Sequence, residues 1–158
     1  MTGGRRSRAA LSGCLGAVLL AALAGCVPDS GGVSGRLERG LDSADSNAQT
    51  ARLALQQLSA GRTTPQHAHT AIDDALTKLG EQQTGLASVE PETAAERRWL
   101  RSTDDAIATL DSALKDARSA ASGSAGIRWS VAQRELDGAR TAIARAKRGI
   151  VTAAGVSE

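Results

Sequence analysis

The strongest constraint on the fold is a repeated four-three spacing of apolar and small residues, which runs through four long segments of the chain. Alternating steps of four and three residues place side chains on one face of an α-helix. The alternation typical of β-strands does not extend over a useful length. The four stripes are predicted at positions 37, 41, 44, 48, 51, 55 and 58; 68, 72, 75, 79, 82, 86 and 89; 100, 103, 107, 110, 114, 117 and 121; and 129, 132, 136, 139, 143, 146, 150 and 153.

Residues that commonly begin or end helices lie between these stripes. They are Ser59-Ala60-Gly61, Thr64-Pro65, Pro91 with Glu92 and Glu96, and Ser122-Gly123-Ser124. Pro91 is expected in the first turn of the third helix, where the two glutamates would face the positive helix end. Four helices of roughly 25 to 30 residues, each about 40 Å long, follow from this spacing. The predicted fold class is all-α, an antiparallel up-down-up-down four-helix bundle.

The composition of the stripes argues against a large cofactor in the bundle. The chain has no Phe, no Tyr and no Met after Met1, and the stripes alternate Leu or Ile with Ala. Small residues allow helices to pack closely, and the Glu-x-x-His motif of di-iron bundles does not occur. Gln82 and Thr103 are the polar exceptions on the stripes and are expected to fix register. No cofactor is expected.

The first 26 residues have the order of an export signal. Three arginines within residues 5–8 precede an uncharged segment of about 15 residues, which is short for a membrane-spanning helix of ~20. The segment ends in Leu23-Ala24-Gly25-Cys26, which resembles the lipobox of bacterial lipoproteins. That resemblance implies cleavage before Cys26 and a diacylglyceryl group on its thiol, which anchors the protein to the extracytoplasmic face of the cell membrane. The alternative is an ordinary signal peptide cut nearby, and the paired arginines leave Sec or twin-arginine export open.

The expected domain organisation follows from this signal. Residues 1–25 form a cleaved signal peptide, 26–34 the lipidated cysteine and a flexible tether, and 35–158 the bundle. Cys14, the other cysteine, lies in the segment expected to be removed, so no disulfide is expected. The signal takes three arginines with it and no acidic residue, which changes the net charge from +2 to about −1. Nucleic acid is therefore not an expected partner.

Few side chains are spaced as in a catalytic or metal-binding site. The only histidines, His67 and His69, lie two residues apart and point away from each other on a helix, so exposed histidines are favoured over a metal site. Asp73-Asp74 and Asp104-Asp105 are expected at one height on neighbouring helices, counting from Pro91. They fall on outward positions, which favours a solvated face over weak Ca²⁺ or Mg²⁺ contact. No catalytic residue is expected.

Two tryptophans are expected to close opposite ends of the core. Trp129 lies on its stripe at the distal end, and Trp99 lies one residue off its stripe near the anchored end, where partial exposure is expected. A binding spot or an interfacial anchor is the alternative role for these tryptophans. Leu53 lies away from the first stripe and is a candidate for an exposed apolar strip.

The sequence thus predicts a membrane-anchored extracytoplasmic lipoprotein with a non-enzymatic interaction or structural role in the cell envelope. Its expected partners are the membrane, through the lipid anchor, and another envelope protein. The alternative is a small-ligand or metal-binding lipoprotein that acts as a carrier or sensor accessory. Arg145, Lys147 and Arg148 end the last helix at the anchored end, where they are candidates for contact with anionic headgroups; stabilising the negative helix end is the alternative role.

Overall fold

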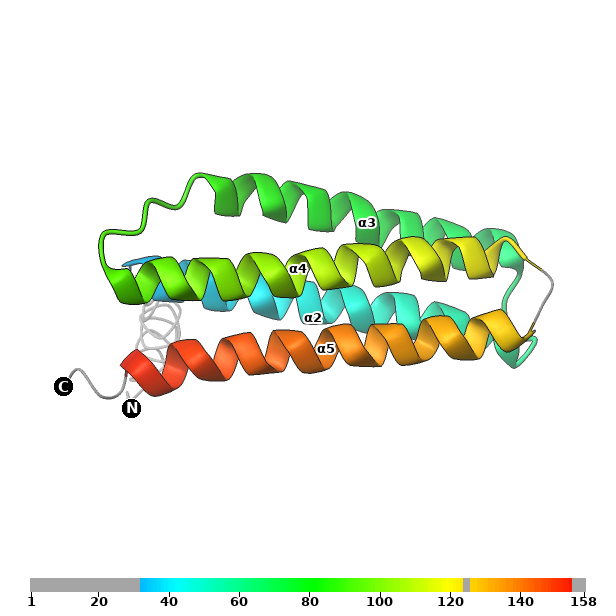
Figure 1. The fold of residues 1–158 in the computed structure, drawn as a ribbon. Helices are drawn as coiled ribbons and strands as arrows, with labels where there is room; N and C mark the ends of the chain where they lie inside the picture. The colour runs from blue at the N-terminus through cyan, green and yellow to red at the C-terminus, as the bar shows by residue number, and fades with distance from the viewer. Residues whose placement is uncertain (1–31, 124–125, 155–158) are drawn as a thin grey trace, which may run out of the picture. The chain divides into compact units, whose positions relative to one another are not determined.

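The computed structural model describes residues 32–123 and 126–154, so the predicted lipobox at residues 23–26 lies outside the described residues. Four helices form an up-down-up-down bundle (Figure 1). They are α2 (Gly32–Ser59), α3 (Pro65–Ala87), α4 (Ala94–Ala121) and α5 (Gly126–Ala154). The predicted all-α four-helix bundle is confirmed. No helix in the described ranges has the apolar length needed to cross a bilayer.

Most of the helix boundaries follow the predicted signals. The Thr64 side chain accepts a hydrogen bond from the backbone N–H of His67, and Pro65 opens α3. Gly61 follows α2 with φ of +67°, a left-handed conformation that favours glycine. One boundary differs from the expectation, because α2 begins at Gly32 and so includes three residues of the expected tether. Val33, in this extra turn, packs against the core.

The beginning of α4 differs from the prediction. Pro91 lies in the non-helical connection 88–93 and not in the first helical turn, so that expectation is wrong. Thr93 and Glu96 form a capping box instead, in which each side chain accepts a hydrogen bond from the other's backbone N–H. These bonds satisfy donors that a helix start leaves unpaired, and α4 therefore begins at Ala94.

The core consists of the four predicted stripes. Their described members are buried except Gln82, Leu100 and Trp129, which are half-buried. Two further rows of small residues, each spaced by seven, are buried beside the stripes of α2 and α4. They are Gly40, Asn47 and Ala54 on α2, and Ala106, Ala113 and Ala120 on α4.

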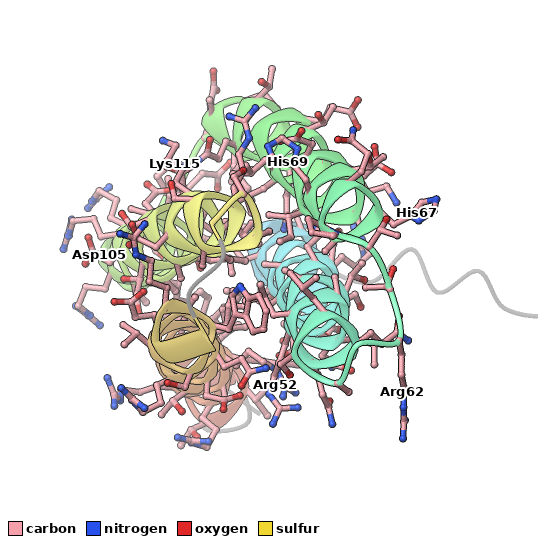
Figure 2. All side chains as sticks on the ribbon, turned by 90° about the vertical axis from the view of Figure 1, so that its right-hand side faces the viewer. Arg52, Arg62, His67, His69, Asp105 and Lys115 are labelled. Carbon is pink, nitrogen blue, oxygen red and sulfur yellow. The ribbon has the colours of Figure 1, made fainter. Side chains whose placement is uncertain are left out.

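These two rows explain why α2 and α4 form the centre of the bundle. Each of these helices contacts all three others, whereas α3 and α5 do not contact each other within the described ranges (Figure 2). Gly40 lies against α3, and a Cβ there would lie 3.3 Å from Gln82 Nε2. On the opposite side, the Trp129 indole of α5 donates to the Ala120 carbonyl at 2.9 Å. Small residues thus let the outer helices approach the central pair closely.

Candidate functional site

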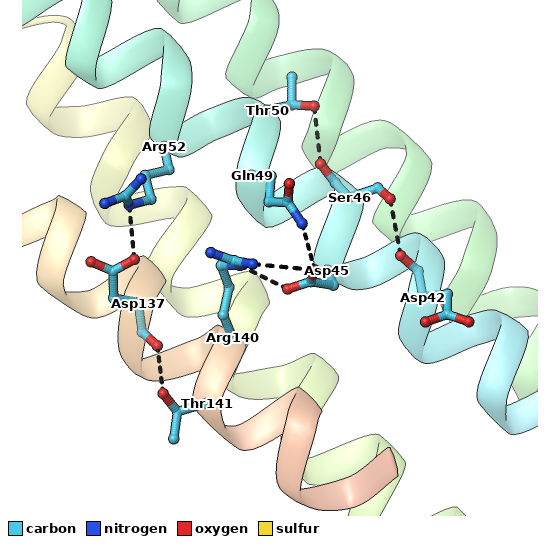
Figure 3. Close-up of polar contacts among 9 residues, drawn as sticks. All are labelled: Asp42, Asp45, Ser46, Gln49, Thr50, Arg52, Asp137, Arg140 and Thr141. Atoms are coloured by element: carbon cyan, nitrogen blue, oxygen red, sulfur yellow. Dashed lines mark hydrogen bonds and ion pairs between the residues drawn. The ribbon is translucent and has the colours of Figure 1, made fainter. Parts of the chain in front are cut away.

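A groove of about 550 Å³ lies between α2 and α5 and is lined mainly by charged residues from both helices. Its charged members are Asp42, Asp45, Asp137, Arg140, Lys147 and Arg148. Figure 3 shows how the two helices place several of these side chains opposite one another. The groove is therefore the first place to look for ligand recognition.

The pair formed by Asp45 and Arg140 is the most sheltered contact in this groove. Arg140 Nε donates to Asp45 Oδ1 at 2.7 Å, and Gln49 Nε2 donates to Oδ2 of the same carboxylate at 2.6 Å (Figure 3). The hydrogen bond from Arg140 lowers the pKa of Asp45 below its ordinary value, against an opposing effect of partial burial. The same bond raises the pKa of Arg140.

Two further ion pairs flank this contact along the same helices. Arg52 Nε lies 2.8 Å from Asp137 Oδ1 toward the distal end, and Lys147 Nζ bonds Asp42 Oδ1 toward the other end. The Asp42 carboxylate raises the pKa of Lys147. As residue numbers rise along α2, the partners' numbers fall along α5, which is the register of antiparallel helices. The charges of the groove largely neutralise one another, so they specify helix register rather than attract a ligand of one charge.

The three basic residues predicted to touch headgroups have unequal surroundings. Lys147 is held by Asp42, which removes it from the set of available cations. Arg145 and Arg148 are exposed, and neither forms an ion pair within the described part of the chain. Sequence reasoning missed this difference because Asp42 lies 105 residues before Lys147.

The two histidines make separate contacts on α3. His67 Nδ1 lies 2.9 Å from Thr64 Oγ1, and His69 Nδ1 lies 2.9 Å from Asp73 Oδ2. Figure 2 shows their side chains pointing away from each other. Asp73 Oδ1 also forms an ion pair with Arg118 Nε of α4 at 2.7 Å, so this cluster links α3 to α4. Among the described residues, no three His, Cys, Asp or Glu side chains are grouped to hold a metal ion.

The two acidic pairs do not share one height, and that expectation is wrong. Asp73 lies opposite Arg118, whereas Asp104 and Asp105 lie at least 13 residues earlier on α4, about 20 Å along the helix. The reason is the connection 88–93, which carries the chain past the end of α3 before α4 begins (Figure 1). Partial burial raises the pKa of Asp104, and the negative charge of Asp105 raises it further by a smaller amount.

The polar residues of the core differ in how well they are satisfied. Gln82 Nε2 donates to the Gly40 carbonyl and thereby ties α3 to α2. Thr103 is fully buried, and its hydroxyl has no hydrogen-bond partner in the described ranges. Asn47, which the stripes did not include, is also buried with an unpaired Nδ2. The burial of Asn47 could have been predicted from its spacing of seven residues from Gly40 and from Ala54.

The tryptophans and Leu53 lie as their stripe positions predicted. Trp99 and Trp129 are both half-buried against the core, and Leu53 is 53 % exposed. Leu53 lines a second groove with polar side chains of α2 and Arg140, so its exposed surface is not part of a broad apolar patch.

Comparison with protein-family models, curated proteins and solved structures finds no match for this chain. The described surface offers paired charges, open grooves between helices and capped helix ends.

Proposed function

We propose that this protein is a lipid-anchored protein of the extracytoplasmic face of the cell membrane. In this proposal, its bundle binds another envelope component through its surface and performs no catalysis. The observation that carries the proposal is the lipobox-like Leu23–Cys26, which ends six residues before α2 begins at Gly32. Six residues span at most about 20 Å, so a lipid on Cys26 would keep this end of the bundle close to the membrane.

The packing of the described core supports recognition at the surface. The stripes fill the interior with Leu, Ile and Ala side chains, and the grooves open between neighbouring helices. The alternative of a metal-binding carrier receives no support from the histidines, because His67 and His69 have different partners. Surface contact is therefore the function that the geometry favours.

The anchor is tested by expressing the full chain in a bacterium that processes lipoproteins. Cys26→Ala should abolish labelling by an alkyne fatty acid, whereas the matched control Cys14→Ala should be labelled like the wild type. Mass spectrometry of the mature N-terminus should find diacylglyceryl on Cys26. An unmodified wild-type N-terminus at another residue would refute the proposal.

The interaction is tested by crosslinking intact cells with an amine-reactive reagent. The exposed Lys78 and Lys115 give reactive positions on α3 and α4. Crosslinks from either lysine to an envelope protein, present in the wild type and lost in Cys26→Ala, would support a partner at the membrane. Crosslinks confined to this chain would count against one.

A further inference from the structure

Charge is distributed unevenly at the end of the bundle where α5 stops. Residues 138–154 of α5 contain four basic residues and no acidic one. Arg140 and Lys147 are neutralised by carboxylates of α2. Arg145 and Arg148 are exposed and have no ion pair in the described part of the chain, so their charges remain available.

The beginning of α4 adds three exposed arginines at the same end, of which Arg97 donates to the Glu92 carbonyl. Arg98 and Arg101 lie three residues apart, as Arg145 and Arg148 do, and this spacing places each pair on one helix face. The bond between Trp129 and Ala120 sets the register of α4 against α5. Antiparallel counting from that bond places Arg101 level with residue 148. The four arginines therefore share one end of the bundle, and we call them the basic end.

Acidic side chains at this end belong mainly to the side of α3. Glu81 lies on α3, and Glu90 and Glu92 lie on its connection to α4. The Glu96 carboxylate is occupied by the backbone N–H groups of Glu92 and Thr93. Glu38 lies on α2, and Asp104 and Asp105 follow on α4, farther from the end than Arg101. The α4–α5 side is therefore the more basic.

The shape of this end reinforces the difference in charge. Figure 1 shows that α4 begins and α5 ends at about the same level, while α3 stops short of it. A flat surface that touched this end would meet α4, α5 and the connection 88–93 before it met α3. The four arginines of the basic end lie on α4 and α5, and the exposed Arg36 near the start of α2 adds a further basic side chain.

We propose that the basic end rests on anionic phospholipid headgroups, so that the bundle leans with α4 and α5 toward the membrane and α3 away from it. This inference rests on the proposed lipid anchor, whose short tether would let the end of the bundle come within about 8 Å of the membrane, the range over which charges act in physiological salt. Each arginine near an anionic surface favours contact by roughly fivefold. Four such residues are enough to set an orientation that the anchor alone leaves free.

The two tryptophans provide a direct readout of this orientation. The chain has only Trp99, near the basic end, and Trp129, near the distal end, and it has no Tyr. The chain from residue 26 onward contains one thiol, Cys26, and includes the whole compact unit 31–158. Coupling that thiol to a maleimide lipid anchors the bundle whether or not cells lipidate it. Failure of this inference is thus distinguishable from failure of the proposed function.

The experiment measures quenching of each tryptophan by a spin label on lipid headgroups. Vesicles of phosphatidylcholine are compared with vesicles of equal parts phosphatidylcholine and phosphatidylglycerol, with Trp129→Phe and Trp99→Phe isolating the two signals. Trp99 should be quenched more strongly in the anionic vesicles, and Trp129 should not respond. Equal Trp99 quenching in both vesicles, or equal quenching of both tryptophans, would overturn the proposal.

Charge variants complete the test. Replacing the four arginines of the basic end by Gln should abolish the part of Trp99 quenching that depends on anionic lipid. The matched control Arg128→Gln with Arg134→Gln removes two exposed arginines from the distal part of α5 and should change nothing. Arg145→Gln with Arg148→Gln alone should weaken the quenching, which keeps the test valid if the fourfold variant folds poorly. Full quenching in these variants would refute the role of the basic end.

Discussion

Helices α3 and α5 occupy equivalent places on opposite sides of the central pair, yet they are held there differently. Helix α5 has three ion pairs to α2 and a tryptophan hydrogen bond to α4. Helix α3 is shorter, and its described polar links to other helices are the Asp73–Arg118 ion pair and the Gln82 amide. Since the described residues of α3 and α5 do not contact each other, each of these helices can be weakened separately. We infer that α3 is the helix that opens more readily.

The largest effect is expected from placing an unpaired charge in one of the buried stripes. Leu114 of α4 is fully buried at the centre, and Leu114→Asp would place an unpaired charge there. The cost of several kcal/mol should unfold the whole bundle, as should Ile143→Asp on α5. Circular dichroism should show lost helicity for both, while Asp105→Asn on the surface should match the wild type. Native-like melting of both stripe variants would contradict the helix packing.

The next effect separates the two outer helices. Leu79→Ala on α3 and Leu136→Ala on α5 each remove a fully buried leucine, at a cost of about 2–5 kcal/mol. Hydrogen exchange should show that Leu79→Ala lowers protection in α3 far more than elsewhere. Leu136→Ala should instead lower protection throughout the bundle. Faster exchange in α5 than in α3 of the wild-type protein would reverse the comparison.

The stripes could be predicted because helical periodicity is a local property of the sequence, and residues such as Leu41, Ile72 and Leu136 are buried as expected. The register of α3 against α4 could not be predicted, because it depends on how far the connection 88–93 extends before α4 begins. The ion pairs of the groove could not be predicted either, because they depend on the register of α2 against α5, and Asp45 and Arg140 lie 95 residues apart. The four-three pattern specified which face of each helix is buried, but not which residues face each other across helices.

A smaller effect is expected from strengthening α3. Gly80 and Gly85 lie in this helix with open space where a Cβ would be, so replacing each by Ala should add up to about 1 kcal/mol of stability. Gly40→Ala on α2 is the matched contrast, because its Cβ would crowd Gln82 and Leu86 of α3. The double α3 variant should raise Tm and slow hydrogen exchange in α3. A Tm increase without slower exchange there would show that α3 does not limit opening.

A change of similar size is expected from the unsatisfied hydroxyl in α4. Thr103→Val keeps the shape of the side chain and removes a fully buried hydroxyl without a partner, which should stabilise the bundle by about 1 kcal/mol. Thr109→Val is the control, because that hydroxyl is exposed and donates to the Asp105 carbonyl. Urea unfolding should give a higher midpoint for the first variant and no gain for the second. Equal midpoints would indicate that the Thr103 hydroxyl is satisfied in solution.

The smallest effect concerns the polar contacts that distinguish α5 from α3, and its sign depends on pH. The folded-state pKa of Asp45 is lowered from 3.8, mainly by Arg140, so this carboxylate stabilises the fold above that ordinary value and loses its contribution as the pH falls through the folded-state pKa. Asp104 has a raised pKa, so its carboxylate destabilises the fold at neutral pH. Asp45→Asn should therefore lower stability at pH 7, and Asp104→Asn should raise it, each by less than about 1 kcal/mol.

Both differences from the wild type should vanish in acid, because the carboxylates are then protonated. Urea unfolding of the three proteins at several pH values from about 7 down to about 2, to reach below the lowered pKa of Asp45, measures this directly. If Asp45→Asn were neutral at every pH, the ion pairs of α5 would contribute register without stability. The apolar stripe and Trp129 would then account for any stronger attachment of α5.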